Sequence, residues 1–375
     1  MWYHIEKKIK TWLLKHLSAG QPTQCLNPED IDWSSIHNIL VIKQHDQFGD
    51  FLLTTPAIRA LRLKCPKAKI SLVVRNYLYP IAQGNPDVDK ICIFYESAWD
   101  WTPMRIYEFK VFLRQPYDLA VVFNTVSHSF SSDMIAYFSR AKITLGPELP
   151  TFDHMNYNPF YSLNAPVDPG PKHQTLRNMD VVRYIGAETD DLSYRFSLSK
   201  VEGSEGKRVI RMLLGDNVGP VLAIHFGTKD PEKRYPIHRL AEIIDCIVKT
   251  GQYKIIVIPS PDEDELLNQL HNNTKCDLVV LPPMALRKVA AFLSNIDLLL
   301  CNDTGILHLA SAVRTPSISF HARSDPSIWK PVGIRHVALY AKAGDIKLIN
   351  VSTVTDLIQN ANDHIGEGNL EIIPC

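Results

Sequence analysis

The sequence predicts an α/β protein built from two doubly wound, Rossmann-like domains that face each other across a cleft. Three observations carry this prediction. Short β-branched runs alternate with helical patterns from residue 38 onward, and the alternation restarts near residue 221 after a looser Pro-, Asn- and Asp-rich section. Such alternation is typical of βαβ units that form a parallel sheet with helices on both faces. The length of 375 residues also favours two domains over one.

The first half is expected to alternate strands and helices up to about residue 147. β-branched runs predict strands, and apolar residues at helical spacing predict helices. A lone helix is expected at 174–185, and the linker between the domains near 195–210. The expected strands are 39–43, 70–74, 91–95, 119–123 and 142–145, and the expected helices are 55–64, 103–114 and 130–139.

The second half repeats the pattern. Four domain ranges follow: a helical extension at 1–35, an N-terminal domain at 36–200, a C-terminal domain at 201–350, and a C-terminal helix and tail at 351–375. Because ligands of open α/β sheets bind outside the carboxyl ends of strands, the loop after each strand is the first place to seek a site. The expected strands are 221–226, 255–258, 278–281, 298–301 and 317–320, and the expected helices are 237–249, 262–271, 285–294 and 351–362.

The composition gives no support to several classes of function. Forty basic residues balance forty acidic ones, so the total charge gives no indication of nucleic-acid binding. The seven cysteines are scattered and contain no CxxC pair, which favours reduced structural thiols in a cytoplasmic compartment over disulfides or a zinc site. No apolar run reaches the roughly 18 residues of a membrane span.

The first twenty residues form a basic amphipathic pattern. Lysines interrupt the apolar residues, so the segment does not read as a secretory signal. Such a helix can lie at the inner face of the cytoplasmic membrane, or its apolar stripe can pack on the body of the protein. The apolar positions at helical spacing are Trp2, Ile5, Ile9, Trp12, Leu13 and Leu17.

The loop after the first strand offers an acceptor-side group. Gly49 supplies either an unusual backbone angle or a close approach to a ligand, and Asp50 follows at a helix N-terminus. Asp50 is either an N-terminal capping acid or a carboxylate that takes a proton from an attacking hydroxyl. Asp46 is a second candidate. No dinucleotide or P-loop glycine pattern is present.

Two loops in the second half suit a phosphorylated ligand. After the strand at 221–226, Thr228 and Lys233 can donate to a phosphate or a sugar hydroxyl, although a solvated basic loop explains them as well. After the strand at 298–301, Thr304 and Gly305 begin a helix whose unpaired N–H groups favour an anion. His308 lies one turn further along this helix. Together these residues predict a nucleotide diphosphate pocket.

Asp303 opens that turn. It suits a ribose hydroxyl or a base amine as a hydrogen-bond acceptor, although Asp303 or Thr304 as a plain N-cap is the simpler alternative.

These motifs together resemble glycosyltransferase family 9, the heptosyltransferases. The resemblance runs from about residue 38 to 335 through "GDFLLTTPAIRAL", "HFGTKDPEKRYP", "NDTGILHLASAV" and "SDPSIWKPVG". It implies the GT-B fold and inverting transfer of heptose from ADP-heptose to the inner core of lipopolysaccharide, with no metal cofactor. The resemblance also implies a lipid-linked glycan acceptor.

The resemblance further implies roles for individual residues. Asp50 matches the proposed general base, Lys233 a lysine that contacts the donor, and 303–305 with His308 the diphosphate-binding turn. The segment "KHQTLRNMDVVRYIGA" is similar to one that places His173 near the cleft.

The sequence departs from the family at two places. The loop before Gly49 is usually small and serine-rich, whereas here it reads "KQHDQF". Glycines often follow the strand at 255–258, whereas "PSPDEDELL" stands here, so either Glu263 or Glu265 is left to meet the ribose. Two other functions stay open: a sugar-nucleotide epimerase of the same fold, and a binding protein without turnover.

Overall fold

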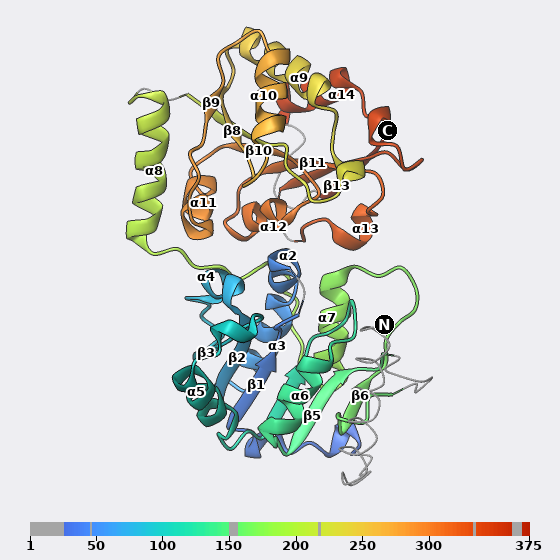
Figure 1. Ribbon diagram of the computed structural model, residues 1–375. Coiled ribbons are helices and arrows are strands. Elements are labelled where there is room, and N and C mark those ends of the chain that lie inside the picture. Colours follow the sequence, from blue (N-terminus) through green and yellow to red (C-terminus); the bar gives the residue numbers. More distant parts are fainter. Residues whose placement is uncertain (1–25, 46, 150–156, 217–218, 333–334, 362–369) are drawn as a thin grey trace, which may run out of the picture. The chain divides into compact units, whose positions relative to one another are not determined.

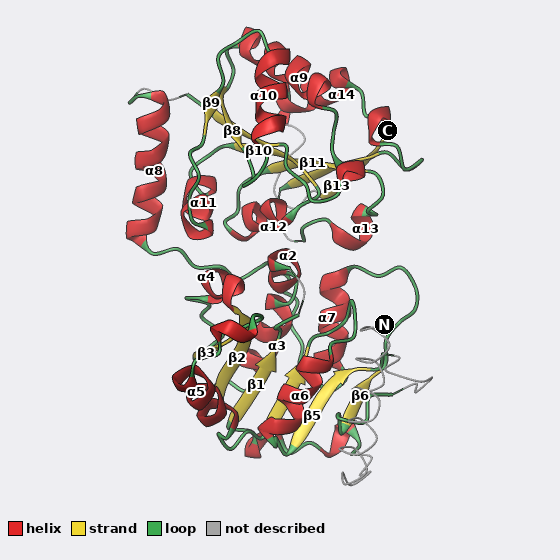
Figure 2. Cartoon of the chain, in the orientation of Figure 1, coloured by secondary structure: helices red, strands yellow, loops and turns green. Residues whose placement is uncertain are grey.

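The chain divides into two compact units, Met1–Asp191 and Leu192–Cys375. The computed structural model describes residues 26–45, 47–149, 157–216, 219–332, 335–361 and 370–375. Each unit has its own parallel sheet with helices on both faces (Figures 1 and 2). This confirms the predicted α/β class with two doubly wound sheets. The predicted domain ranges stay a prediction.

The first unit has a six-stranded parallel sheet in the order β3-β2-β1-β4-β5-β6. The order reverses between β1 and β4, which are neighbours in the sheet but not in the chain. The strands are β1 Asn38–Ile42, β2 Lys69–Arg75, β3 Lys90–Phe94, β4 Leu119–Val122, β5 Ile143–Pro147 and β6 Leu163–Ala165. All four residues of β4 are buried, as expected for a central strand covered on both faces.

The helices of the first unit begin at conventional signals. Thr102 and Ser129 accept hydrogen bonds from backbone N–H groups at the starts of α5 and α6, and Pro103 opens α5. The helices are α2 Phe48–Leu52, α3 Thr55–Lys64, α4 Tyr79–Ala82, α5 Pro103–Leu113, α6 Phe130–Ser139 and α7 Gln174–Arg183, with short 3₁₀ helices at Pro28–Asp30, Trp33–Ser35, Asn76–Leu78 and Ala98–Asp100.

The second unit has a seven-stranded parallel sheet in the order β13-β12-β11-β10-β7-β8-β9. Its order reverses between β7 and β10. The strands are β7 Val221–His225, β8 Lys254–Ile258, β9 Val279–Val280, β10 Leu298–Asn302, β11 Ser317–His321, β12 His336–Tyr340 and β13 Leu370–Pro374.

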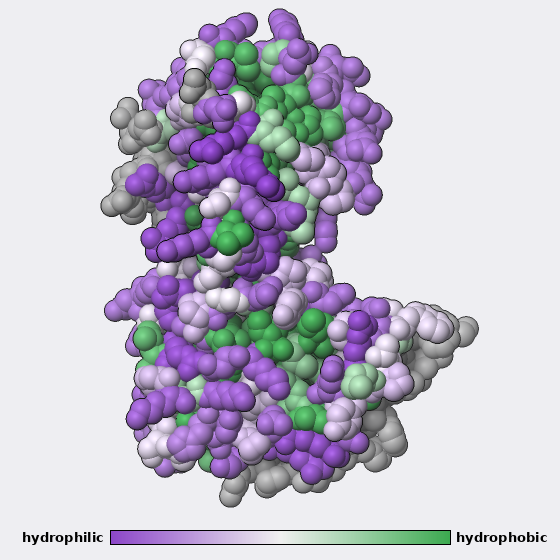
Figure 3. Space-filling model, turned by 90° about the vertical axis from the view of Figure 1, so that its left-hand side faces the viewer, coloured by the Kyte–Doolittle hydropathy of each residue, from purple (hydrophilic) through white to green (hydrophobic). Residues whose placement is uncertain are grey.

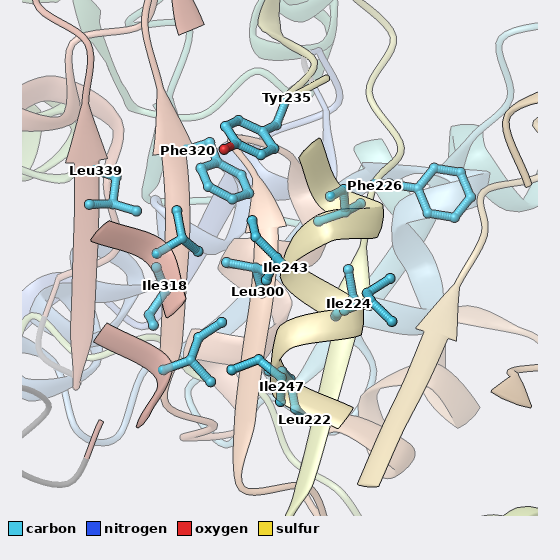
Figure 4. Packing of buried hydrophobic residues seen from close by; sticks show 14 of the residues in the cluster. Leu222, Ile224, Phe226, Tyr235, Ile243, Ile247, Leu300, Ile318, Phe320 and Leu339 are labelled. Atoms are coloured by element: carbon cyan, nitrogen blue, oxygen red, sulfur yellow. The ribbon is translucent and has the colours of Figure 1, made fainter. Parts of the chain in front are cut away.

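Helices α9, α10 and α14 lie on one face of this sheet, and α11 and α12 lie on the other (Figure 1). The face under α9 carries the core of the unit, in which Tyr235 and Phe320 stack with ring centroids 4.1 Å apart (Figure 4). The helices are α8 Lys200–Leu214, α9 Ile237–Thr250, α10 Asp264–Asn273, α11 Leu286–Leu293, α12 Gly305–Ala312, α13 Pro326–Trp329 and α14 Val351–Gln359, with 3₁₀ helices at Pro231–Lys233 (η5) and Ile346–Leu348.

One stretch expected to be a linker is a helix. Residues 200–214 form α8, which starts at a capping box between Ser199 and Glu202 and packs on α11. Gly206 permits this close packing, since a Cβ there would lie 2.0 Å from the carbonyl oxygen of Ala291. The predicted linker at 195–210 was therefore wrong, because the Ser-x-x-Glu signal at 199–202 was overlooked.

The predictions for the C-terminal tail and for the N-terminal segment can be compared with the structure. The tail after α14 includes β13, which pairs in parallel with β12. The amphipathic pattern of residues 1–20 lies outside the described residues. Within the described part, no helix is long and apolar enough to span a membrane. The face drawn in Figure 3 is mostly hydrophilic, with smaller hydrophobic areas.

The sheet order determines where ligands are expected. The carboxyl ends of β7 and β10 adjoin at the reversal point of the second sheet, and those of β1 and β4 at that of the first. Open α/β sheets bind ligands at such points. The loops that carry Thr228, Asp303 and Thr304 follow β7 and β10, and Asp50 follows β1, so the sequence candidates lie where each sheet favours binding.

Candidate functional site

The turn between β10 and α12 exposes an uncapped helix N-terminus. Thr304 is the N-cap residue of α12, with an extended backbone (φ −144°, ψ 171°), but its side chain makes no capping hydrogen bond. Its Oγ1 is buried and has no hydrogen-bond partner in the described part of the chain. A buried polar atom of this kind needs an explanation. A ligand bound at the turn would supply one, because the first-turn N–H groups and the helix dipole favour an anion.

Asn302 ties this turn to the neighbouring loop. Its Nδ2 donates to the carbonyl oxygen of Phe226 at 2.8 Å, and its Oδ1 accepts from the backbone N–H of Tyr235 at 3.0 Å. The side chain is only 2% exposed. Asn302 therefore links the end of β10 to both ends of the loop between β7 and α9. Sequence reasoning missed this role, because Asn302 was read as part of the turn.

Asn302→Ala is expected to destabilise the second unit by about 3 kcal/mol, because it leaves a buried carbonyl and a buried N–H without partners. Urea unfolding measures the change. The matched control is Asn360→Ala, which removes an exposed hydrogen bond from Asn360 to the carbonyl oxygen of Asp356 and should cost less than about 0.5 kcal/mol. Equal effects for the two variants would show that Asn302 does not hold the loops.

Asp303 and Lys233 lie together at the mouth of this turn. The Lys233 Nζ is 3.7 Å from Asp303 Oδ2, and the Asp303 side chain is only 11% exposed. Burial alone would raise the pKa of Asp303. Nearby His321, the Ser324 hydroxyl, His308 and Lys233 outweigh burial and lower the pKa, so Asp303 is an anion at neutral pH. An ionised carboxylate can accept hydrogen bonds from ligand hydroxyl or amine groups.

The loop after β7 is closed by Glu263. Its two carboxylate oxygens accept from the backbone N–H groups of Thr228 at 3.3 Å and Ser260 at 3.2 Å. Gly227 lets these side chains approach the loop, since a Cβ there would lie 2.1 Å from Ser260 Oγ and 2.4 Å from Glu263 Oε2. By contrast, Glu265 accepts from Gln269 along the exposed face of α10. Of the two acids left open by the sequence, Glu263 is the one beside the loop.

The hydroxyl and the carbonyl of Thr228 already accept hydrogen bonds within the loop. Its Oγ1 accepts a hydrogen bond from the backbone N–H of Asp230 at 3.3 Å, and Arg234 Nη2 donates to its carbonyl oxygen at 3.1 Å. An accepting hydroxyl keeps its own hydrogen for another partner. Thr228 can therefore still donate to a ligand, as the sequence reading expected, and that role stays a prediction.

Several buried histidines of the second unit lie near these loops. His308 is buried on α12 and its ring lies 6.0 Å from that of Tyr194. His321 ends β11, and His225 ends β7 with its Nδ1 2.9 Å from the carbonyl oxygen of Ile258. Burial lowers the pKa of His225 and His336, and it lowers the pKa of His321 to about 4. These three imidazoles are neutral at pH 7.

Acidification is expected to destabilise the second unit. A histidine whose folded pKa is lowered contributes stability above the unfolded value of about 6.5, and this stability is lost as pH falls toward the folded pKa. For His321 the loss amounts to about 2 kcal/mol at pH 5. Thermal or urea unfolding at pH 7 and pH 5 should show a smaller pH effect in His321→Gln than in wild type. An unchanged pH effect would contradict a neutral buried His321.

In the first unit, Asp50 has a structural partner. It is the third residue of α2, and its Oδ2 accepts from the backbone N–H of Gln47 at 3.0 Å in a capping box. The capping role that the sequence analysis considered for Asp50 is therefore present. The Asp50 side chain is half-buried. Its charge acts on Tyr77 after β2. Gly49 is buried within α2, and Asp46 lies outside the described residues.

His173 caps a helix. Its Nδ1 accepts from the backbone N–H of Thr175 at 3.1 Å, at the N-terminus of α7. The other ring nitrogen, Nε2, then carries the proton in the neutral imidazole. The position is compatible with the acceptor side that was predicted for it, and that role stays a prediction.

Sequence reasoning missed a polar chain across the first sheet. His45 follows β1, and its Nε2 lies 3.0 Å from Ser127 Oγ after β4. Its Nδ1 lies 3.3 Å from Arg75 Nη2 at the end of β2, and Arg75 pairs with Glu96 after β3 at 2.9 Å. The ends of four strands are therefore joined. His45 was noted only as a bulky departure, although polar residues after several strands were an available signal.

The described residues were also compared with the requirements of a metal site. Among the residues that the structure describes, no three or more His, Cys, Asp or Glu side chains are grouped so as to hold a metal ion. The charged groups at the β10–α12 turn are one carboxylate and one ammonium, which form a pair with each other.

Comparison with known sequences identifies the family. The sequence pattern of "Glycosyltransferase family 9 (heptosyltransferase)" matches residues 107–352. The chain belongs to glycosyltransferase family 9. The chain is similar to lipopolysaccharide heptosyltransferase 3 of Escherichia coli, with 23% identity over 291 residues, or 76% of this chain and 83% of that one. The chain is therefore a glycosyltransferase of the heptosyltransferase family.

Solved structures confirm the GT-B fold. A family 9 glycosyl transferase from Veillonella parvula DSM 2008 has a TM-score of 0.75 at 18% identity and covers 88% of this chain and 97% of its own. The E. coli heptosyltransferase WaaC with ADP has a TM-score of 0.68 at 19% identity and covers 86% and 99%. The same enzyme has been solved with ADP-2-deoxy-2-fluoro heptose, with a TM-score of 0.64.

Proposed function

We propose that this family 9 member is an inverting, metal-independent enzyme that transfers heptose from ADP-heptose to a lipopolysaccharide-core or related glycan acceptor. The observation that carries the proposal is the uncapped N-terminus of α12, with the unpartnered Thr304 hydroxyl and with Lys233 and Asp303 beside it. This arrangement suits a nucleotide diphosphate. The relative solved with ADP supports the choice of nucleobase.

The second unit binds the donor in this proposal. The N–H groups at Thr304 and Gly305 hold the diphosphate, and Lys233 and His308 add donors. Thr228 donates to a phosphate or sugar hydroxyl. Asp303 accepts from a ribose hydroxyl or a base amine. Of the two acids that the sequence left open, Glu263 accepts from the ribose after it leaves its loop contacts.

The first unit binds the acceptor and supplies the base. Asp50 takes the proton from the acceptor hydroxyl, and the hydroxyl oxygen attacks the anomeric carbon on the face opposite the diphosphate. The bond from that carbon to the diphosphate oxygen breaks in the same step, which inverts the configuration. The dipole of α12, Lys233 and His308 stabilise the negative charge that develops on the departing ADP. Gly49 and His173 line the acceptor side.

Localisation follows from the substrate. A lipid-linked acceptor is presented at a membrane surface, so the enzyme is expected in the cytoplasm, with contact to the inner face of the cytoplasmic membrane. The basic amphipathic segment at 1–20 would provide the contact. A variant that begins near residue 36 should partition less onto anionic liposomes than the full chain, and equal partitioning would contradict this role.

An acceptor-dependent assay tests the reaction. The protein, ADP-heptose and heptose-free lipopolysaccharide core are incubated in excess EDTA, and released ADP and the anomeric configuration of the product are measured. The expected result is ADP release only with acceptor, with inversion. Conversion without acceptor would favour an epimerase, and binding without turnover would favour a binding protein. Loss of activity in EDTA that magnesium restores would contradict the metal-free reaction.

A further inference from the structure

A buried row of polar side chains lies next to Asp303 on strands β11 and β12. Ser317, Ser319 and His321 alternate along β11, so they point to the same face of the sheet. Ser317 pairs in register with His336 on β12. None of these four side chains is more than 1% exposed. Polar groups are retained in such a place only when their hydrogen bonds are largely satisfied.

The four side chains form one hydrogen-bonded chain. Ser317 Oγ lies 3.0 Å from His336 Nδ1, His336 Nε2 lies 3.3 Å from Ser319 Oγ, and Ser319 Oγ lies 2.6 Å from His321 Nε2. Each hydroxyl has one hydrogen and each neutral imidazole has one N–H. The protons along the chain must therefore all be ordered in one direction or all in the other.

Asp303 lies beside the end of this chain. Asn302 pairs in register with Phe320, and the Asp303 N–H donates to the Phe320 carbonyl oxygen at 3.3 Å. The next residues, Asp303 and His321, are thus neighbours on adjacent strands. Each is also the charged or ionisable group that acts most strongly on the other. The remaining ionisable groups near His321 are His308 on α12, Lys233 on η5, Asp325 before α13 and His336 on β12.

The charge of Asp303 selects one proton order. If Ser319 donates to His321 Nε2, the proton of His321 resides on Nδ1, and its positive end can face the carboxylate. In the opposite order, Nδ1 carries a lone pair, which a neighbouring carboxylate disfavours. His321 Nδ1 has no hydrogen-bond partner within the described ranges. At the other end of the chain, the backbone of Ser317 also forms a hydrogen bond with His336, so the proton order depends on that contact as well as on Asp303.

We propose that His321 is a positioning residue that presents an Nδ1–H to the Asp303 carboxylate, with its tautomer fixed by the Ser317–His336–Ser319 chain. Lys233, the Ser324 hydroxyl and His321 then act together on Asp303, and its remaining lone pairs are oriented toward the nucleotide sugar. This inference rests on the proposed donor-binding role of Asp303. The serine and histidine hydrogen bonds themselves do not depend on that role.

The tautomer can be measured without any ligand. Long-range ¹H–¹⁵N spectra of ¹⁵N-histidine-labelled protein at pH 7 distinguish Nδ1–H from Nε2–H, and loss of a signal in His321→Asn assigns His321. The expected form is Nδ1–H, and Asp303→Asn should weaken that preference. An Nε2–H tautomer, or a preference that Asp303→Asn leaves unchanged, would overturn the proposal. Ser319→Ala, which breaks the chain, is a second variant and should also weaken the preference.

Two isosteres then test the consequence for binding. An asparagine at 321 places its amide nitrogen near the position of Nδ1, whereas a glutamine places its amide near Nε2. In an ADP titration in EDTA, His321→Gln should bind about tenfold more weakly than wild type, and His321→Asn within about threefold. In an Asp303→Asn background, His321→Gln should have no further effect.

The outcomes separate this inference from the proposed function. Equal losses in the Asn and Gln variants, or losses that add to that of Asp303→Asn, would show that His321 serves only the fold. If wild type does not bind ADP, the proposed function fails. The NMR tautomer then still decides whether His321 faces Asp303 as proposed.

Discussion

Asp50→Asn is expected to lower the rate of glycosyl transfer by about two orders of magnitude or more and to leave the fold of the first unit intact. The asparagine cannot take a proton from the acceptor. Its Oδ1 can still accept the hydrogen bond from the Gln47 N–H that Asp50 Oδ2 accepts at 3.0 Å. Asparagine thus separates the two roles that the sequence left open for Asp50. Turnover with saturating acceptor and ADP affinity are the two measurements, and ADP affinity should not change.

Two variants control this experiment. Asp50→Ala removes both the base and the capping contact, whereas Gln47→Ala leaves the Gln47 N–H and removes only the side chain of the capping box. If Asp50 is the base, Asp50→Asn and Asp50→Ala should be similarly inactive and Gln47→Ala should stay close to wild type. If Asp50→Asn stays within a few-fold of wild type while Asp50→Ala does not, capping is the whole role of Asp50.

Thr304→Val is expected to weaken ADP binding by about tenfold to a hundredfold without destabilising the free protein. The valine is nearly isosteric and removes a hydroxyl whose oxygen is buried and has no hydrogen-bond partner in the described residues. Loss of a hydrogen bond to a charged ligand group accounts for the weaker binding. Removal of an unsatisfied buried polar atom costs the free protein little and can stabilise it.

The combination of the two effects makes this test specific. Thr304→Ser keeps the hydroxyl and should bind ADP within about threefold of wild type. Titration calorimetry gives the affinity, and thermal unfolding without nucleotide gives the stability. If Thr304→Val is less stable than wild type and binds ADP equally well, the hydroxyl serves the fold, and the β10–α12 turn is not the diphosphate site.

Much of the fold could be predicted from local sequence. The apolar runs at 221–226 and 298–301 became β7 and β10, and the helix expected at 55–64 is α3. Whether such a segment forms a strand or a helix depends mainly on the pattern of its own residues. The order of strands in each sheet depends on which strands pair across long stretches of chain, and no local pattern reports it. The strand β13 was missed for the same reason, since it pairs with β12 only after an intervening helix.

The candidate site also contains residues that have a local sequence signal and residues whose roles depend on distant contacts. Asp303, Thr304 and Gly305 could be proposed as candidates because a polar turn directly after an apolar strand is a local signal. Asn302 and Glu263 act on backbone groups of other loops, so their roles require the structure. His321 was not considered, because the expected strand ended at residue 320. Its hydrogen-bonded partner on β12, reached through Ser319, lies in a strand that sequence reasoning did not predict.

The most direct measurement is a calorimetric titration of the full chain, in EDTA, with ADP, GDP, UDP and CDP and their available sugars. The proposal predicts that ADP and ADP-heptose bind more tightly than the other nucleotides, and that Thr304→Val removes most of this affinity. Preference for a GDP- or UDP-sugar would contradict the proposed donor. Binding of none of the four nucleotides would contradict the nucleotide site at the β10–α12 turn.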